Sequence, residues 1–127
     1  MSVDKNIRIL VVEDNAKIRT LTVGILNSCG FNAIVEADNG KIAWDLLKKD
    51  PFDLVMTDWM MPEMNGLELL KKIRAHESDL KDIPVLMITA SDNQKDIVAA
   101  AKWKISGYVV KPFSVKTILS KLNEALG

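Results

Sequence analysis

Five short runs of aliphatic and β-branched residues recur along the chain, and each predicts a β-strand. The runs cover residues 7–12, 31–36, 53–57, 84–88 and 107–110. The first and third are almost continuously apolar, which is typical of parallel strands that are covered on both faces. The segments between the runs carry apolar residues at helical spacing. Because strand and helix alternate strictly, we predict right-handed crossovers and a parallel sheet with helices on both faces.

The residues at the ends of the helical segments fit this alternation. Gly30 follows the first helical segment and Asn39 precedes the second, as expected of a helix C-terminus and a helix N-terminus. With 127 residues, of which 48% are apolar and 27% charged, the chain has the size and composition of one globular domain. We therefore expect a single domain over residues 1–127 with a doubly wound α/β fold.

The charge balance and the single cysteine limit the class of protein. Seventeen basic residues balance seventeen acidic ones, so no overall field favours nucleic acid or an anionic membrane. Cys29 has no second cysteine with which to form an internal disulfide, and the N-terminal segment lacks the pattern of a signal peptide. No apolar run of the sequence approaches the roughly 18 residues of a membrane span. We expect a soluble, cytoplasmic, monomeric protein.

Polar residues follow four of the predicted strands at the point where each strand ends. Glu13 and Asp14 follow the first strand, Asp58 the third, Thr89 the fourth and Lys111 the fifth. Ligands of open parallel sheets bind beyond the carboxyl ends of the strands, so these side chains are expected to converge. Three carboxylates at one edge repel one another unless a cation compensates, and Mg²⁺ prefers such oxygen ligands. The sequence thus predicts a magnesium site beside a hydroxyl group and an amine.

Four stretches of the chain are similar to the receiver domains of response regulators, and the similarity covers essentially the whole length. They read LVVEDN, TDWMMPEMNGLELLKKIR, PVLMITAS and SGYVVKPF, and they look most like the stand-alone chemotaxis regulators of the CheY type. The resemblance implies a (βα)5 flavodoxin-like fold whose five parallel strands lie in the order 2-1-3-4-5. It also implies that the protein is a switch of two-component signalling and not an enzyme. The only reactions that such a switch catalyses are its own phosphorylation and dephosphorylation.

The resemblance implies which residues bind the metal and the phosphoryl group. Asp58 is expected to be the phosphoacceptor. Glu13 and Asp14 are expected to bind Mg²⁺ together with Asp58 and the backbone carbonyl of Met60. A carboxylate can attack phosphorus to form an acyl phosphate, so the residue type suits the role.

The resemblance also implies a switch and two kinds of partner. Thr89 and Lys111 are expected to contact the phosphoryl oxygens, and Thr89 and Tyr108 to form the switch. The family's Lys-Pro peptide is usually cis, so a cis bond is expected between Lys111 and Pro112. The phosphoryl donor is expected to be a sensor histidine kinase. An output protein is expected to bind the face formed by the fourth helix, the fifth strand and the fifth helix.

Several other prominent residues have simpler structural interpretations. His76 lies near the end of the third helix and is expected to be exposed or to interact with the helix dipole, without a catalytic role. Trp44 has the spacing of a helix core residue, and Trp59 should report on the site that it adjoins. The basic residues of the second and third helices are expected to be solvated; they are Lys48, Lys49, Lys71, Lys72 and Arg74.

The chain departs from the chemotaxis pattern ahead of the fifth strand. Trp103, Lys104 and Ile105 stand where that pattern has small residues, so the fourth helix must end differently. Either Lys104 adopts a left-handed conformation at some strain, or the helix cap moves to Gly107. Trp103 is expected to be exposed. The departure lies beside the expected output face and leaves the identity of the output partner open.

Three other functions have to be weighed against a chemotaxis-type messenger. An intermediate that passes phosphate to a histidine phosphotransfer protein shares every motif, and the sequence does not separate it. A flavodoxin-like electron carrier needs a phosphate-binding loop after the first strand, where Glu13 and Asp14 would repel phosphate. A hydrolase of the haloacid dehalogenase type needs Asp-x-Asp at that place, and this chain has Glu-Asp-Asn.

Two positions at the rim of the site predict a long-lived acyl phosphate. Met60 and Ser91 lie two residues after Asp58 and Thr89. The fast-clearing chemotaxis regulators commonly carry Asn and Glu at these positions, which can orient the attacking water. Because Met60 can only shield that water's path, we expect slower hydrolysis.

Overall fold

Five parallel strands form a central sheet in the order β2-β1-β3-β4-β5. The computed structural model describes residues 4–90 and 93–126. The strands are β1 (Ile9–Val12), β2 (Ile34–Ala37), β3 (Leu54–Asp58), β4 (Val85–Thr89) and β5 (Gly107–Val110). The strand order and the parallel direction confirm the predicted doubly wound fold.

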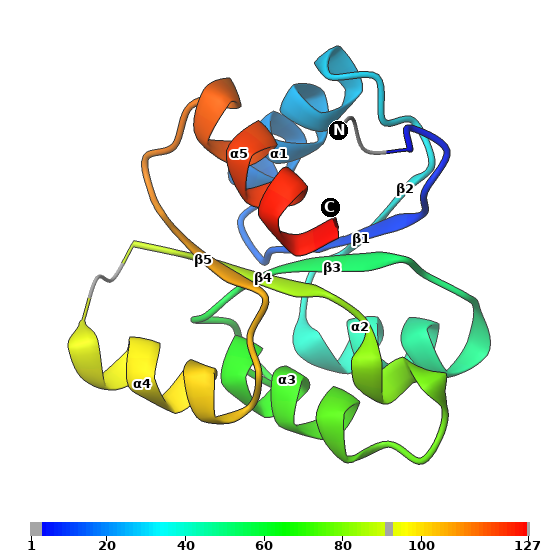
Figure 1. Ribbon diagram of the computed structural model, residues 1–127, viewed down its shortest axis with the longest axis vertical. Helices are drawn as coiled ribbons and strands as arrows, with labels where there is room; N and C mark the ends of the chain where they lie inside the picture. The colour runs from blue at the N-terminus through cyan, green and yellow to red at the C-terminus, as the bar shows by residue number, and fades with distance from the viewer. Residues whose placement is uncertain (1–3, 91–92, 127) are drawn as a thin grey trace.

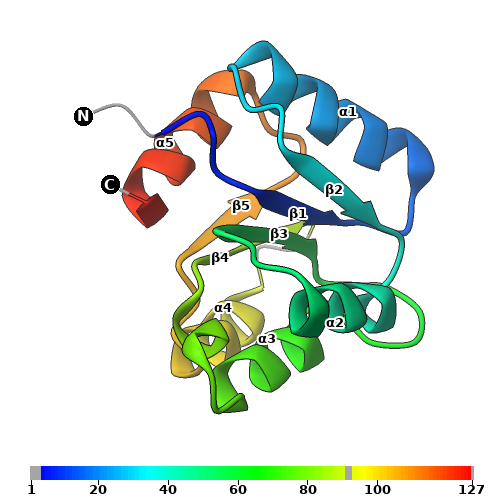
Figure 2. The same ribbon diagram turned by 90° about the vertical axis from the view of Figure 1, so that its right-hand side faces the viewer.

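Helices cover both faces of the sheet, as Figures 1 and 2 show. On one face lie α1 (Ala16–Ser28) and α5 (Val115–Leu126), and on the other lie α2 (Gly40–Lys49), α3 (Gly66–Ala75) and α4 (Gln94–Lys102). A short 3-10 helix, η1 (Asp79–Asp82), precedes β4. Among the described residues, no helix is long and apolar enough to cross a membrane.

Alternate residues of the central strands belong to two separate hydrophobic clusters, one on each face of the sheet. Leu10 and Val55 belong to the cluster that includes residues of α2 and α3, whereas Ile9 and Leu54 belong to the cluster that includes residues of α1 and α5. All four side chains are completely buried. This two-sided burial explains why the strands read as continuous apolar runs in the sequence.

Asparagine begins four of the helices, and one of them was predicted. Asn15, Asn39, Asn65 and Asn93 are the N-caps of α1, α2, α3 and α4, and each side chain accepts hydrogen bonds from backbone N–H groups of the first turn. Asn65 also forms a capping box with Glu68. These caps set the points at which the chain leaves the carboxyl edge of the sheet.

The second strand begins three residues later than predicted. The expected strand covered residues 31–36, whereas β2 is Ile34–Ala37. Phe31 is fully buried, but its N–H donates to the carbonyl of Leu26 in α1. The preceding Gly30 has a φ of +97°, so these residues form the end of a helix rather than a strand. The apolar residue that closes a helix cap was therefore mistaken for the start of a strand.

The fourth helix ends with a left-handed lysine. Lys104 has a φ of +57°, its N–H donates to the carbonyl of Ala101, and the next N–H, of Ile105, donates to Ala100. These are the bonds of a Schellman cap, so the first of the two expected alternatives is correct. Trp103 is 37% exposed, as predicted.

Arg74 is not a freely solvated side chain, and that prediction is wrong. Its guanidinium donates four hydrogen bonds of 2.7–3.1 Å to backbone carbonyls, those of Trp103, Lys81, Ile83 and Lys104. One arginine thus joins the end of α3 to the segments that precede β4 and β5. Burial lowers the pKa of Arg74, although the charge of Asp82 opposes that shift.

The remaining structural expectations hold with small changes. The lysines of α2 and α3 that were expected to be solvated are exposed. Trp44 is only half-buried, and its indole lies edge-on to His76 with ring centroids 5.5 Å apart. His76 is the C-cap residue of α3, and its Nδ1 lies 2.8 Å from the Ser78 hydroxyl. Neither the Trp44 ring nor the His76 ring therefore gains a role at the carboxyl edge of the sheet.

Candidate functional site

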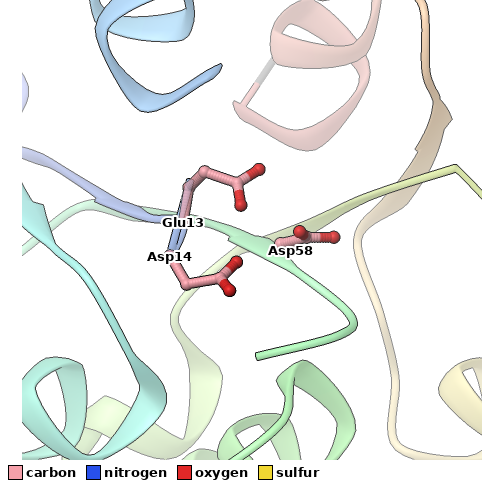
Figure 3. Close-up of side chains that lie close together, drawn as sticks. All are labelled: Glu13, Asp14 and Asp58. Carbon is pink, nitrogen blue, oxygen red and sulfur yellow. The ribbon is translucent and has the colours of Figure 1, made fainter. Parts of the chain in front are cut away.

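Three carboxylates meet at the carboxyl edge of the sheet, as Figure 3 shows. Glu13 and Asp14 follow β1 directly and Asp58 is the last residue of β3, the strand that pairs with β1. One carboxylate oxygen from each residue lies within 4.8 Å of the others. Glu13 is buried at 5% exposure and Asp14 is exposed, so the cluster opens toward solvent at Asp14.

The buried carboxylate is held by the start of α1. The N–H of Asn15 donates to Oε2 of Glu13 at 3.2 Å, and Nη1 of Arg19 donates to the Glu13 backbone carbonyl at 2.7 Å. Nε of Arg19 also contacts Glu36, the third residue of β2, at 3.0 Å. Sequence reasoning missed Arg19 as a residue that positions the site, although it lies one helical turn after the Asn15 cap.

Lys111 compensates the negative charge of the cluster. Its Nζ lies 2.6 Å from Oε1 of Glu13 and 3.2 Å from Oδ2 of Asp58. Burial acts to lower the pKa of Lys111, but the hydrogen bond to Glu13 and the charges of both carboxylates outweigh it and hold the pKa above its ordinary value. The ammonium therefore stays charged. The peptide bond from Lys111 to Pro112 is cis, as expected.

The two carboxylate oxygens of Asp58 have different partners. Oδ1 accepts the backbone N–H of Trp59 at 2.7 Å, and Oδ2 accepts from Lys111. The first turn of α3 packs directly against this strand end: a Cβ on Gly66 would lie 2.3 Å from the backbone carbonyl of Asp58. Sequence reasoning assigned no role to Gly66. The glycine directly after the Asn65 helix cap is the signal that marks this close approach.

The expected switch residues lie on the two strands beyond Asp58. Thr89 ends β4 and is 2% exposed; in the β3–β4 register it follows Ile88, the residue opposite Asp58. Tyr108 in β5 is half-buried, and its ring centroid lies 6.4 Å from that of Trp59. The Trp59 backbone N–H thus contacts the Asp58 carboxylate, while the Trp59 ring faces Tyr108 of β5.

One of the two residues expected to tune the phosphoryl lifetime lies at the edge of the site. The Met60 side chain is 72% exposed beside Asp58, which suits a rim position. Ser91 lies outside the described residues.

The donor set fits a hard divalent cation. Octahedral Mg²⁺ keeps its oxygen ligands about 2.1 Å from the ion, so neighbouring and opposite ligands lie about 3–4 Å apart. The three carboxylates, within 4.8 Å of one another, need only small movements to reach that spacing. Because Lys111 already bonds to Glu13 and Asp58, an ion would share these oxygens with the ammonium. Asp14, which is exposed, would complete the acidic donor set.

Comparisons with known proteins agree with this architecture. The model of the response regulator receiver domain matches residues 9–123. The chain is 47% identical over 121 residues to chemotaxis protein CheY-3 of Vibrio cholerae, covering 95% of this chain and 92% of that protein. It is 40% identical to a chemotaxis protein CheY homolog of Campylobacter jejuni, covering 94% of this chain and 92% of that protein.

Solved structures with the same fold include a chemotaxis protein and the receiver domain of a sensor histidine kinase. The chemotaxis protein CheY4 of Vibrio cholerae has a TM-score of 0.87 and 30% identity, covering 95% of this chain and 99% of that one. The receiver domain of a sensor histidine kinase from Pseudomonas aeruginosa has a TM-score of 0.86 and 25% identity, covering 96% and 98%. That structure holds a magnesium ion in its active-site cleft. From the match over residues 9–123 and these relatives, the chain belongs to the response regulator receiver domain family.

Proposed function

We propose that this receiver is a phosphorylation-activated switch, in which Asp58 accepts a phosphoryl group from a sensor histidine kinase with the help of Mg²⁺. One observation carries the proposal: the ammonium of Lys111 and the carboxylates of Glu13 and Asp14 surround Asp58 at the carboxyl edge of β3. Mg²⁺, held by Glu13, Asp14, Asp58 and the Met60 carbonyl, would neutralise charge on the phosphoryl oxygens.

The residues around Asp58 suit distinct tasks in phosphoryl transfer. The N–H of Trp59 fixes Oδ1, which leaves Oδ2 as the oxygen that attacks phosphorus. Lys111, already 3.2 Å from Oδ2, can follow the charge as it moves onto the phosphoryl oxygens. The Thr89 hydroxyl, at the end of the adjacent strand, can donate to the same oxygens. Positioning and charge compensation are the main requirements of this loose transition state.

The proposed output is a change in a protein-binding surface. Thr89 would shift toward the phosphoryl oxygens and Tyr108 would reorient, which biases a two-state equilibrium of α4, β5 and α5. The relatives that are 40–47% identical are chemotaxis proteins, and this favours a messenger that binds an output protein. We further propose that residues 1–127 form one monomeric, cytoplasmic receiver domain that does not bind nucleic acid.

Acetyl phosphate provides the direct test of the acceptor. With Mg²⁺ present, intact-mass analysis should show the addition of one phosphoryl group to the wild type and none to Asp58→Asn. Asp38→Asn is the matched control, because Asp38 is an exposed aspartate that follows β2, a strand separated from β3 by β1. Phosphorylation of a folded Asp58→Asn variant at the wild-type level would refute the assignment.

A transfer assay separates the messenger from the phosphorelay intermediate. The phosphorylated receiver is mixed with a histidine phosphotransfer protein from the same cell, and the label on each protein is followed. The messenger function predicts that the phosphoryl group stays on the receiver until it is hydrolysed. Rapid transfer to the histidine protein would favour the phosphorelay.

The lifetime of the acyl phosphate is a separate proposal that rests on Met60 and Ser91. The Met60→Asn, Ser91→Glu double variant should lose phosphate faster than the wild type at saturating Mg²⁺, because polar rim groups can orient water. A barrier lower by about 1.4 kcal/mol corresponds to a tenfold faster rate. Equal rates would show that these two positions do not set the lifetime.

A further inference from the structure

A groove of about 500 Å³ runs between α3 and α4, which lie side by side below the sheet in Figure 1. Leu67 of α3 and Val98 and Ala99 of α4 give it an apolar lining, and Trp103 lies at its C-terminal end along α4. The side chains of Val98 and Trp103 are 44% and 37% exposed. Large apolar side chains that remain exposed within a groove are typical of a contact surface.

Lysines line both sides of this apolar strip. Lys71 lies on the α3 side, and Lys95 and Lys102 lie seven residues apart on α4, two helical turns along the same face. None of the three forms an ion pair with a residue in 4–90 or 93–126. No acidic residue belongs to the described lining. Nζ of Lys71 lies over the Trp103 ring, 5.7 Å from its centroid, so this ammonium is already held at the groove. The charges of all three lysines therefore remain without a compensating carboxylate among the described residues.

The positive surface continues past the end of the groove. Lys102 and Trp103 also line a second pocket of about 390 Å³, to which Lys81 and Lys104 add two lysines and Asp82 adds one acid. The whole chain has a formal net charge of zero, so this excess is local. It creates a field that attracts an acidic partner to this side of the molecule.

We propose that the groove between α3 and α4 is a docking site for an acidic segment of a partner protein that carries a large apolar side chain. The apolar side chain would lie between Val98 and Trp103. Carboxylates on either side of it would face Lys71 on one helix and Lys95 and Lys102 on the other. Burial of the apolar side chain supplies affinity, and the flanking charges supply orientation and rate of association.

This surface differs from the expected output face. The groove lies on the α3 side of α4, whereas the output face comprises α4, β5 and α5. A protein could therefore occupy the groove while the output face remains accessible on the other side of α4. Because the groove contains none of the residues proposed to take part in phosphoryl transfer, the proposal can be tested on the unphosphorylated chain.

The probe is a short peptide in which glutamates flank one phenylalanine. Nuclear magnetic resonance of the isotopically labelled full chain should show shifts confined to α3, α4 and the Trp103 indole. The affinity should fall as salt is added, because exposed charges are screened. Replacing the phenylalanine by serine, or the glutamates by lysines, should abolish most of the binding.

A charge-reversal pair tests the residues themselves. Lys71→Glu with Lys102→Glu should weaken binding of the peptide about tenfold, since each exposed ion pair contributes only modestly. Lys48→Glu with Lys49→Glu on α2 is the matched control and should leave the affinity unchanged. A milder pair, Lys71→Gln with Lys102→Gln, serves if the reversal impairs folding, and thermal unfolding monitors that.

Several results would overturn the proposal. These are the absence of binding to the wild type at low salt, shifts centred on β5 and α5, or an equal loss in the Lys48 and Lys49 control. Tighter binding of a duplex DNA fragment to the same lysines would assign the groove to nucleic acid. Concentration-dependent shifts of the groove without peptide would assign it to a second copy of this chain.

Discussion

Lys104 has a φ of +57° at the end of α4, and replacing it with glycine should stabilise the fold. A left-handed backbone costs a residue with a Cβ roughly 1–2 kcal/mol, which glycine avoids. Glycine loses about 0.5–1 kcal/mol more conformational entropy on folding, so the net gain should be about 0.5–1 kcal/mol. The hydrogen bonds from the Lys104 N–H to Ala101 and from Arg74 to the Lys104 carbonyl use backbone atoms and remain possible.

Urea denaturation measures this gain against a matched control. Lys104→Ala also removes the exposed charge but keeps the Cβ, so its midpoint should not rise above that of the wild type. If the three proteins share one m-value, the difference in midpoint between the Gly and Ala variants reports the backbone strain. A Gly variant no more stable than the Ala variant would show that the left-handed lysine carries no strain that matters for folding.

Four further substitutions test the packing and the charge balance of the fold. Gly66→Ala should destabilise the fold by about 3 kcal/mol, because its Cβ would overlap the rigid backbone carbonyl of Asp58. In contrast, Gly24→Ala has nothing within 4 Å of the new Cβ and should stabilise α1 in the same urea assay. Arg74→Met should lower the free energy of unfolding by about 2 kcal/mol, because the part-buried carbonyl of Ile83 loses its hydrogen-bond donor, whereas the other three carbonyls can bind water. An unchanged denaturation midpoint would contradict this. Asp14→Ala should raise the midpoint without Mg²⁺ by relieving repulsion and abolish most of the stabilisation by added Mg²⁺, and a fully retained Mg²⁺ response would remove Asp14 from the metal site.

The sequence predicts the residues that gather at the sheet edge because each follows its strand directly. A parallel sheet brings the strand ends together whatever the helices do, so Asp58 and Lys111 could be placed near each other without knowledge of the packing. Their partners are harder to predict. Arg19 contacts the backbone of Glu13, and a backbone carbonyl gives no signal in the sequence.

Hydrogen bonds to backbone atoms explain the other expectations that are wrong or open. Arg74 looks like any exposed helix arginine, and only the folded chain reveals that the segments before β4 and before β5 aim their carbonyls at it. The sequence leaves two alternatives for the end of the fourth helix, a left-handed Lys104 or a cap at Gly107. It does not separate them, because lysine disfavours the left-handed conformation but does not exclude it. Phe31 was assigned to a strand because burial in a helix cap and burial in a sheet give the same apolar pattern.

The contact between Lys111 and Glu13 joins residues 98 positions apart in the sequence. As the chain is synthesised from its N-terminus, all three carboxylates emerge well before the lysine that neutralises them. The acidic cluster can therefore reach its final balance of charge only when β5 has paired with β4, the last strand pair to become possible during translation. Under the proposed function, the capacity to accept a phosphoryl group would then appear last, and a kinase would modify only molecules whose entire sheet has assembled.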